Sequence, residues 1–317
     1  MTTTFQNIKK AHERISPFVH RTPIHSSRII NEMVGGQLFF KCENFQKGGA
    51  FKARGAFNAI HSLDEVTVKR GVVTHSSGNH AAAVALGANS RNTTAHVVMP
   101  SNASAVKKAA VKGYGANVIE CAPVLADRES TAKRIIEETG ATFLHPYNDE
   151  RVIAGQGTAA LEMIEDLAEA GEKLDIVMCP VGGGGLLAGT ALVTRSLLPT
   201  AKIVAAEPKG ADDAKRSFDA GVLIPQTAPD TIADGLLTSV GEINFPIIME
   251  NVDDILTVSE ESIIGAMRLM WQHMKVIVEP SGAVPLAAIL EHELDLKNRK
   301  MGIILSGGNV DIDRLPW

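Results

Sequence analysis

The sequence has few cysteines, few aromatic residues and no excess of positive charge. Its three cysteines, Cys42, Cys121 and Cys179, are odd in number and far apart, and none forms a CxxC pair. This spacing argues against a disulfide framework and a zinc site, so we expect reduced, buried cysteines. The formal net charge is −5 and Lys and Arg form no basic stripe, so nucleic acid is not an expected partner.

The sequence also lacks a segment typical of secretion or membrane insertion. The N-terminal residues MTTTFQNIKKAHERI are polar and contain no apolar signal core. Residues 176–194 carry no charge and are long enough to span a bilayer. The PVGGGG in their middle, however, predicts a strand, a loop and a helix. We therefore expect a cytoplasmic protein without a membrane segment.

Short β-branched runs alternate with Ala-rich or amphipathic helical patterns along the chain. The expected strands are Leu38–Cys42, Gly71–Thr74, Ala95–Met99, Asn117–Glu120, Asp175–Cys179, Lys202–Ala206 and Met301–Leu305. Clear helical patterns occupy Asn79–Ser90, Ala103–Gly113, Asp127–Gly140, Gly157–Ala170 and Glu260–Lys275. This alternation predicts an α/β fold with parallel or mostly parallel sheets flanked by helices. Ligands in such folds bind at the carboxyl ends of the strands.

A glycine run gives the strongest local signal. Four consecutive glycines join an expected strand to an expected helix: Gly182, Gly183, Gly184 and Gly185. Their backbone N–H groups, together with the positive end of the helix dipole, suit an anion such as a phosphate. A flexible loop that needs positive φ is the simpler alternative. No Gly-Lys-Ser/Thr follows, so the run is not a Walker loop.

The same run permits a second interpretation. Gly183, Gly185 and Ala188 match G-x-G-x-x-A, and Glu207 ends the next expected strand, where a dinucleotide-binding acid belongs. At this point a nicotinamide-dependent oxidoreductase is a genuine alternative.

Two further motifs favour another cofactor. The turn Thr-His-Ser76-Ser77-Gly78-Asn79 joins a strand to a helix, and it offers donors for a carboxylate, although such residues also cap helices. Lys52 lies among glycines that permit close approach, and a desolvated lysine amine attacks aldehydes. A phosphate loop, a carboxylate turn and this lysine together fit pyridoxal phosphate. A dehydrogenase has no use for the second and third motifs.

With these motifs the chain resembles the fold-type II pyridoxal-phosphate enzymes, which are tryptophan synthase β-like. It is most similar to serine racemases and to serine/threonine and hydroxyaspartate dehydratases. The landmarks, between about residues 15 and 310, include FQKGGAFKARGAFNA, THSSGNHA, VIAGQGT, PVGGGGLLAG, TIADG, VEPSG and LSGGNVD. The resemblance implies a large domain of residues 1–64 and 150–317, a small domain of residues 65–149, and no regulatory C-terminal domain.

The resemblance implies cofactor contacts residue by residue. Lys52 corresponds to the lysine that binds the cofactor aldehyde, and Phe51 to the neighbour that packs on the ring. Asn79 corresponds to the partner of the ring hydroxyl, and Gly182–Gly185 to the phosphate loop. Ser306 corresponds to the hydroxyl that faces the pyridine nitrogen. A neutral hydroxyl there makes the ring a weaker electron sink, which suits elimination over transamination.

The resemblance also implies roles toward a small amino-acid substrate. Ser77 corresponds to a second acid/base on the ring face opposite Lys52. The remaining positions that resemble substrate contacts are Ser76, Gly78, His80, Arg128 and Thr238. Ala50 and Ala82 depart from the Ser and Gln that relatives often have. These departures leave the substrate preference open.

A last segment resembles a divalent-cation site. Glu207, Asp213 and the carbonyl of Ala211 supply oxygen ligands, which suit Mg²⁺, Ca²⁺ or Mn²⁺, although two acids in a loop are more often solvated. Lys47 and Asn309 occupy positions that resemble an ATP activator site at a dimer interface. We accordingly expect a homodimer.

The implied activity is racemisation, β-elimination to a keto acid and ammonia, or both, on serine or a related small hydroxy amino acid. Lys52 would remove the Cα proton in either reaction, and Ser77 would return a proton on the opposite face in racemisation. Both reactions begin with the same step, so the sequence does not decide between them. threo-3-Hydroxyaspartate is an alternative substrate, and the oxidoreductase remains the alternative from another class.

Overall fold

The computed structural model describes residues 3–317, which form two lobes, each built on its own sheet. The larger sheet has the strand order β1-β2-β10-β7-β8-β9 and is parallel except for the β1–β2 pair. The second sheet, with the order β5-β4-β3-β6, is entirely parallel. The expected α/β class with mostly parallel sheets is therefore confirmed.

The strands of the larger sheet are β1 (Ile24–His25), β2 (Gln37–Cys42), β7 (Ile176–Pro180), β8 (Lys202–Pro208), β9 (Asp254–Val258) and β10 (Lys300–Leu305). Those of the second sheet are β3 (Val72–His75), β4 (Ala95–Pro100), β5 (Asn117–Cys121) and β6 (Thr142–Phe143). All seven expected strands are confirmed to within two residues at each end. The strands β1, β6 and β9 were not expected, because they are two-residue pairs or carry a weak pattern.

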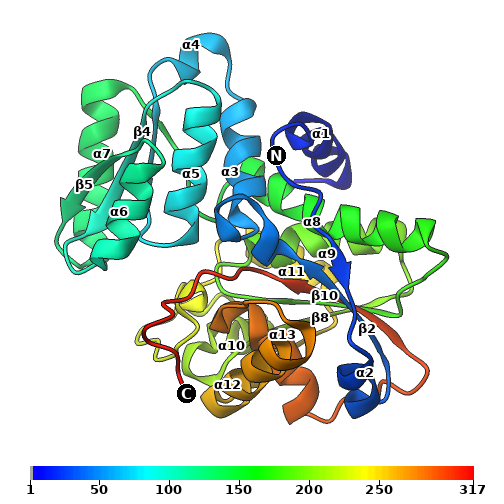
Figure 1. Ribbon diagram of the computed structural model, residues 1–317. Helices are drawn as coiled ribbons and strands as arrows, with labels where there is room; N and C mark the ends of the chain where they lie inside the picture. Colours follow the sequence, from blue (N-terminus) through cyan, green and yellow to red (C-terminus); the bar gives the residue numbers. More distant parts are fainter. Residues whose placement is uncertain (1–2) are drawn as a thin grey trace.

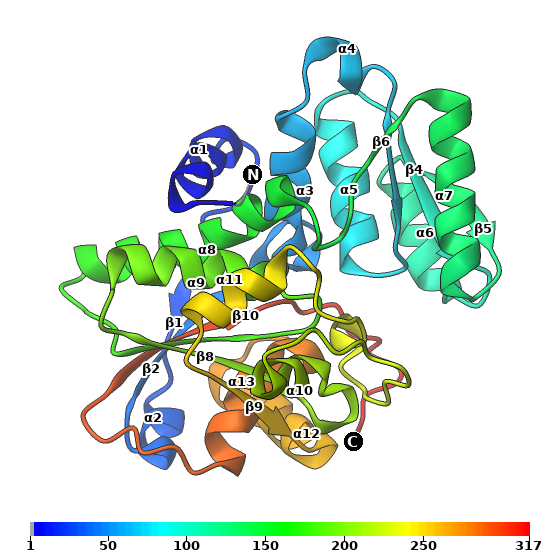
Figure 2. The same cartoon turned by 180° about the vertical axis from the view of Figure 1, so that it is seen from behind.

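Helices cover both faces of each sheet (Figures 1 and 2). The large lobe contains α1 (Phe5–Ile15), α2 (Arg28–Val34), α3 (Lys52–His61), α8 (Glu150–Glu169), α9 (Gly185–Leu197), α10 (Asp213–Ala220), α11 (Asn244–Asn251), α12 (Glu260–Leu269) and α13 (Pro280–Glu291). The second lobe contains α4 (Glu65–Val68), α5 (Asn79–Ser90), α6 (Ala105–Gly113) and α7 (Leu125–Thr139). Short 3₁₀ segments are η1 (Glu43–Phe45), η2 (Lys47–Gly49), η3 (Lys209–Ala211) and η4 (Asp234–Leu236), and a π turn, η5 (Met270–Met274), follows α12.

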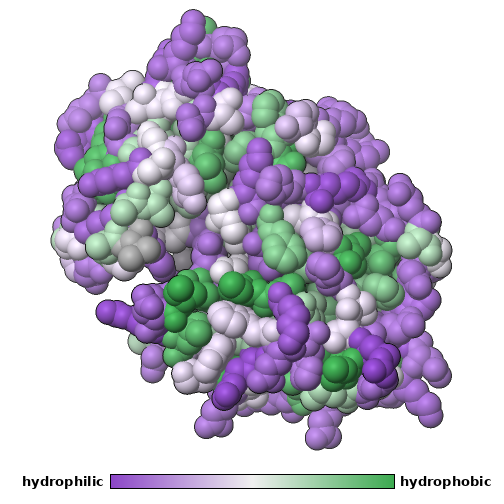
Figure 3. Space-filling view, in the orientation of Figure 1, coloured by the Kyte–Doolittle hydropathy of each residue, from purple (hydrophilic) through white to green (hydrophobic). Residues whose placement is uncertain are grey.

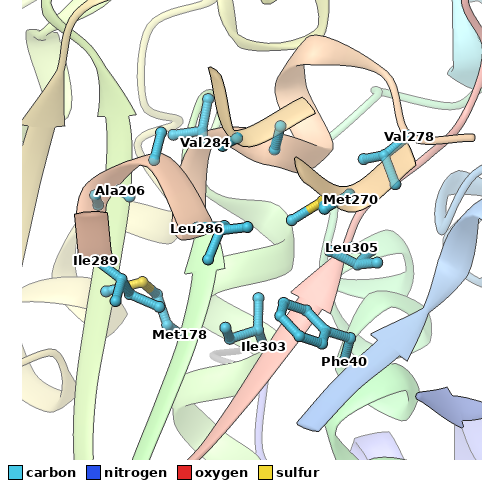
Figure 4. Packing of buried hydrophobic residues seen from close by; sticks show 14 of the residues in the cluster. Phe40, Met178, Ala206, Met270, Val278, Val284, Leu286, Ile289, Ile303 and Leu305 are labelled. Carbon is cyan, nitrogen blue, oxygen red and sulfur yellow. The ribbon is translucent and has the colours of Figure 1, made fainter. Parts of the chain in front are cut away.

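The large sheet separates two hydrophobic cores. One core joins the sheet to α2, α12 and α13, and Figure 4 shows Phe40 and Ile303 of the sheet facing Leu286 of α13. The other core joins the opposite face to α1, α8, α9 and α11. Residues 301–305 of β10 are fully buried on both faces, as expected for a central parallel strand.

Two helix boundaries differ from the sequence prediction. The helix expected at Gly157 begins at Glu150, where the Asp149 side chain caps it by accepting from the backbone N–H of Arg151 at 2.8 Å. Its glycines, which usually weaken helices, allow close packing, since a Cβ on Gly155 would lie 2.5 Å from the Arg54 carbonyl oxygen. The helix expected at Glu260–Lys275 ends at Leu269, before the π turn.

The lobes meet along α3, which packs on α8 in the large lobe and on α5 in the second. The strands of the second sheet lie between residues 72 and 143. The division at residues 64/65 and 149/150 stays a prediction, because α3 contributes to the hydrophobic core of the second lobe.

Two smaller expectations can be compared with the fold. All three cysteines are free, but Cys121 is only half-buried, whereas Cys42 and Cys179 are buried as expected. Cys121 lies in the outermost strand of its sheet, where one side remains open to solvent.

Residues 176–194, the uncharged segment of the sequence, form β7, the glycine loop and most of α9. Among the described residues, no helix combines the length and apolarity needed to cross a membrane.

Candidate active site

Lys52 begins α3, beside the carboxyl end of β10. The Phe51 N–H donates to the Ser306 carbonyl at 2.9 Å, and Ala50 pairs with Gly307 in an isolated bridge. The Lys52 amine donates to the Pro146 carbonyl oxygen at 2.9 Å. Removal from water lowers the pKa of Lys52 from 10.5 to about 8, although the Glu279 carboxylate acts in the opposite direction. The amine is therefore partly neutral, and so nucleophilic, near physiological pH.

A buried charge network anchors the first turn of α3. The Arg54 guanidinium donates to both carboxyl oxygens of Glu43 and of Glu162, at 2.7–2.8 Å. Lys41 completes the network, with its amine 2.9 Å from Glu162. These four side chains are at most 2% exposed and carry two charges of each sign. Paired in this way, they connect α3 to β2, η1 and α8, and so fix the helix that carries Lys52.

The glycine run follows β7 and begins α9, as predicted. Gly184 has a φ of 87° and occupies the N-cap position, so only glycine adopts this backbone without strain. Within the described part of the chain, the N–H groups of Gly182, Gly183 and Gly184 donate no hydrogen bond. Free N–H groups at the start of a 13-residue helix suit an anion, and we call them the phosphate cradle after the predicted ligand.

The segment between β6 and α8 joins the lysine to this cradle. Pro146 accepts from Lys52, and the next residue, Tyr147, packs against the glycines. A Cβ on Gly183 would lie 2.2 Å from Cγ of the Tyr147 ring. Neither Pro146 nor Tyr147 was predicted as a site residue. A proline and an aromatic residue directly after a short strand gave only a weak signal.

His145 shapes the same segment. Its Nδ1 accepts from the backbone N–H groups of Tyr147 and Asn148, at 3.3 and 2.9 Å. Burial, helped by the positive charge of Lys52 and by His75, lowers the pKa of His145 to about 4. The imidazole is therefore neutral and acts as a fixed acceptor for this turn.

The predicted carboxylate turn follows β3 in the second lobe. Gly78 is the N-cap of α5 and no side chain caps this helix, so the capping role considered for these serines is wrong. The Ser76 hydroxyl instead accepts from the Gly78 N–H at 3.4 Å. Within the described residues Ser77 makes no hydrogen bond and is partly exposed. Its hydroxyl is therefore available to a ligand.

His80 lies inside the second lobe beneath this turn. Its Nε2 donates to the Leu144 carbonyl at 3.3 Å, while its Nδ1 is buried without a partner. Burial, assisted by the nearby Lys52 charge, holds the pKa of His80 well below its usual value. His80 is thus a neutral hydrogen-bonding group, so a side-chain contact with substrate would not involve a positive charge.

Asn79 takes part in a polar cluster that the sequence did not reveal. Its amide donates to both carboxyl oxygens of Glu279, at 2.9 and 3.2 Å, and accepts from the Asn309 amide at 2.9 Å. Burial raises the pKa of Glu279 to about 7, against the effect of the Asn79 hydrogen bond. Glu279 lies in the VEPSG landmark. From the sequence alone, a buried acid at this position looks the same as an exposed acid at the start of a helix.

The remaining residues that were predicted to bind substrate or ATP are Lys47, Asn309, Thr238 and Arg128. The Asn309 amide also donates to the Gly48 carbonyl at 2.7 Å, and the Lys47 amine lies 5.9 Å from the centre of the Phe57 ring. Burial raises the pKa of the Tyr147 phenol, and the nearby Thr238 side chain acts in the opposite direction. Arg128 lies on α7, and within the described residues its buried Nε has no hydrogen-bond partner.

The predicted cation ligands lie at the end of β8, in the large lobe. Glu207 accepts from the backbone N–H groups of Ala214 and Lys215, and Asp213 from that of Val240. Both acids are fully buried, and Asp213 Oδ1 has no hydrogen-bond partner among residues 3–317. Burial raises the pKa of Glu207 to about 8 and of Asp213 to about 6. Within residues 3–317, no three His, Cys, Asp or Glu side chains are arranged so that they could hold a metal ion together.

The lysine, the glycine cradle and the serine turn thus lie at the carboxyl ends of parallel strands from both lobes. A family model of pyridoxal-phosphate-dependent enzymes matches residues 15–307. The chain belongs to this family. That membership decides against the nicotinamide-dependent oxidoreductase. The contacts of Lys52 with Pro146 and of Tyr147 with Gly183 join the lysine to the N–H cradle.

The chain is similar over almost its full length to characterised relatives. It is 48% identical to a β-hydroxyaspartate dehydratase of Paracoccus denitrificans, covering 99% of this chain and 98% of the relative. It is 50% identical to a serine racemase of Dictyostelium discoideum, with 99% and 97% covered. The crystal structure of serine racemase from Dictyostelium discoideum superposes with a TM-score of 0.93 over 98% of this chain and all of that one. The structure of maize serine racemase is 47% identical and superposes with a TM-score of 0.95, over 99% and 95%.

Proposed function

We propose that this protein racemises serine or a related small hydroxy amino acid, eliminates its β-hydroxyl, or does both, with pyridoxal phosphate as cofactor. The observation that carries the proposal is the position of the Lys52 amine. It lies against Pro146, and the neighbouring Tyr147 packs on the phosphate cradle of Gly183. The relatives named above support the substrate class, since they are serine racemases and a hydroxyaspartate dehydratase.

Each part of the site has a defined task in this proposal. Gly182–Gly185 bind the cofactor phosphate, Lys52 binds its aldehyde, and Asn79 and Ser306 face the ring. Bound pyridoxal phosphate supplies an electron sink for the electron pair left at Cα. The turn at Ser76–Gly78 presents backbone donors to the substrate carboxylate. Since the pKa of Lys52 is about 8, its freed amine is neutral often enough to accept the Cα proton.

The two reactions then differ in what happens after the Cα proton moves. In racemisation the Ser77 hydroxyl returns a proton on the face opposite Lys52, and the enantiomer forms. In elimination the β-hydroxyl takes up the proton that Lys52 removed from Cα and leaves as water. A water molecule then hydrolyses the remaining enamine to a keto acid and ammonia. The accessible Ser77 hydroxyl, which makes no internal hydrogen bond in the described chain, supports its assignment as the second acid/base.

The alternative substrate, threo-3-hydroxyaspartate, carries a second carboxylate. The unpartnered Nε of Arg128 supports this alternative, because a guanidinium binds carboxylates and His80 is neutral. Incubation with L-serine, D-serine, L-threonine and threo-3-hydroxyaspartate, with keto acid and enantiomer measured together, tests both substrates. If none of the four compounds is converted, the proposed function is rejected.

We also propose a divalent cation, Mg²⁺ or else Ca²⁺ or Mn²⁺, held by Glu207, Asp213 and the Ala211 carbonyl. Two buried acids with raised pKa values, one with an unpartnered oxygen, support this site, because a cation would offset the cost of burying their charges.

We further propose that the protein is a cytoplasmic homodimer, with ATP bound as an activator at Lys47 and Asn309. The exposed Phe45, 43% accessible, lies near Lys47 and supports an interface there. Sedimentation with and without ATP tests this part.

A further inference from the structure

An ion pair joins the two lobes across the side of the site where the substrate turn lies. The Lys107 amine is 2.7 Å from Asp234 Oδ2. Lys107 belongs to α6 of the second lobe, and Asp234 begins η4 of the large lobe. Their side chains are 45% and 54% exposed. Figure 3 shows the hollow between the two lobes, bordered on its lower side by apolar residues.

The segment around Asp234 is part of the large-lobe half of the site. A Cβ on Gly182 would lie 2.9 Å from the Leu236 Cα, so η4 packs directly on the phosphate cradle. The Gly235 N–H donates to the Ser281 hydroxyl at 3.1 Å, which holds the turn against α13. A displacement of Asp234 therefore moves the wall of the cradle.

Lys107 belongs to the other half of the site. Its helix α6 follows β4, which pairs with β3, and it contacts α5. Ser77 lies in the turn between β3 and α5 and Asn79 begins α5, so both belong to the same lobe as Lys107. The ion pair thus links the lobe that carries the substrate turn to the segment that packs on the phosphate cradle.

Both charges also act on the buried Glu279, which binds Asn79. The Asp234 carboxylate contributes to raising the pKa of Glu279, and the Lys107 amine contributes to lowering it. The pair therefore lies within electrostatic range of the polar cluster around Asn79. This agrees with the contacts that place it at the edge of the site.

We infer that Lys107 and Asp234 are positioning residues, whose ion pair holds the two halves of the active site together when the second lobe closes over substrate. A surface pair of this kind shifts an equilibrium only about two- to fivefold, so closure is favoured while product release stays easy. If only the closed form binds substrate well, losing the pair lowers the fraction of enzyme that is closed. The apparent dissociation constant then rises by the same factor. Saturating substrate restores closure, so kcat should remain unchanged.

The experiment compares the holoenzyme with Lys107→Gln, Asp234→Asn and the double variant. Lys108→Gln is the matched control, because Lys108 is on the same helix but pairs with Glu120 of its own lobe, at 2.7 Å. We expect each single variant to raise KM for L-serine elimination about two- to fivefold, and the double variant to add nothing further. Salt at about 1 M should raise the wild-type KM to the same level, because screening weakens the pair. Lys108→Gln should keep the wild-type KM.

The inference would be overturned if the effects of Lys107→Gln and Asp234→Asn on KM simply added in the double variant. It would also be overturned if Lys108→Gln raised KM by the same factor. Hydrogen exchange of residues 105–113 and 232–238 in the substrate-free holoenzyme gives a second readout, which should accelerate in the two pair variants only. The inference rests on the proposed function only for the choice of substrate. If the wild type converts no hydroxy amino acid, the proposed function fails, and unchanged exchange in the pair variants would separately reject the ion-pair role.

Discussion

The Lys52 amine donates to the carbonyl oxygen of Pro146 at 2.9 Å. Pro146 lies in the segment that leads from the second lobe back to α8, and Tyr147 beside it packs on Gly183. Two consecutive residues therefore contact both the lysine and the phosphate cradle. This dipeptide therefore connects the lysine to the glycine run.

Lys52→Ala should abolish the visible absorption band of the bound cofactor and essentially all turnover, because no other amine would hold the aldehyde. The exposed Lys69→Ala is the control and should keep both. Absorbance spectra before and after borohydride, together with keto-acid formation, measure the change. Full activity of Lys52→Ala without an added amine would show that another residue binds the cofactor.

Gly183→Ala should weaken cofactor binding at least tenfold. The added methyl group would overlap the Tyr147 ring, whose Cγ lies 2.2 Å from the new atom, so the ring and the segment after Pro146 must move. Titration of the apoprotein with pyridoxal phosphate measures the dissociation constant. Gly265→Ala is the control, since a Cβ there meets no atom within 4 Å. Tyr147→Ala added to Gly183→Ala should recover part of the affinity, and no recovery would argue against this contact.

The sequence was most informative where function demands an unusual residue. The glycine run, Lys52 and the serine turn stood out because ordinary strands and helices rarely need them. Strands such as β10 were predictable because a buried parallel strand is an apolar run. The start of α8 could not be predicted from the sequence, because packing on α3 and α9 overrides the low helix propensity of Gly155 and Gly157.

The residues that sequence reasoning missed act through tertiary contacts. Glu279 becomes significant only because burial places it against Asn79, which lies 200 positions away in the chain. Tyr147 becomes significant only because Gly183 has no side chain. Neither relationship has a local signal in the sequence, since both contacts join segments that follow strands of the second sheet to segments of the large lobe.

Chelation should destabilise the wild type if Glu207 and Asp213 hold a cation. A ligand that binds only the native state stabilises it by about 2.7 kcal/mol at a hundredfold excess over its dissociation constant. A chelator should therefore lower the melting temperature of the wild type and leave Glu207→Gln/Asp213→Asn nearly unmoved. Asp212→Asn, which removes the neighbouring acid paired with Arg216, should respond like the wild type. Equal shifts in all three proteins would show that these acids bind no cation.

Glu279 should make the apoprotein more stable at mildly acidic pH. Because the pKa of Glu279 is raised from 4.5 to about 7, the folded state keeps a proton that the unfolded state has lost between these values. Its contribution is present below pH 4.5 and disappears as the pH rises toward 7. At about 1.4 kcal/mol per unit, the difference approaches 3 kcal/mol.

Glu279→Gln provides the comparison, because its amide resembles the protonated acid and keeps an oxygen to accept from Asn79 and Asn309. Urea unfolding of both apoproteins at pH values from about 5 to 7 measures the effect. The wild-type free energy of unfolding should fall relative to that of the variant across this range. A constant difference between them would mean that Glu279 is ionised throughout.

Ser77→Ala should separate the two proposed reactions. Since Lys52 and Ser77 act on opposite faces in this proposal, removing the hydroxyl should abolish racemisation and the processing of D-serine. Dehydration of L-serine requires proton removal only on the Lys52 face, so it should survive at least in part. Within the described residues the Ser77 side chain makes no hydrogen bond and caps no helix, so stability should change by no more than about 0.5 kcal/mol. A loss of activity would then reflect chemistry. The ratio of racemisation to elimination, measured on one sample, is independent of the amount of active enzyme. A wild-type ratio in Ser77→Ala would assign the second proton transfer to another group.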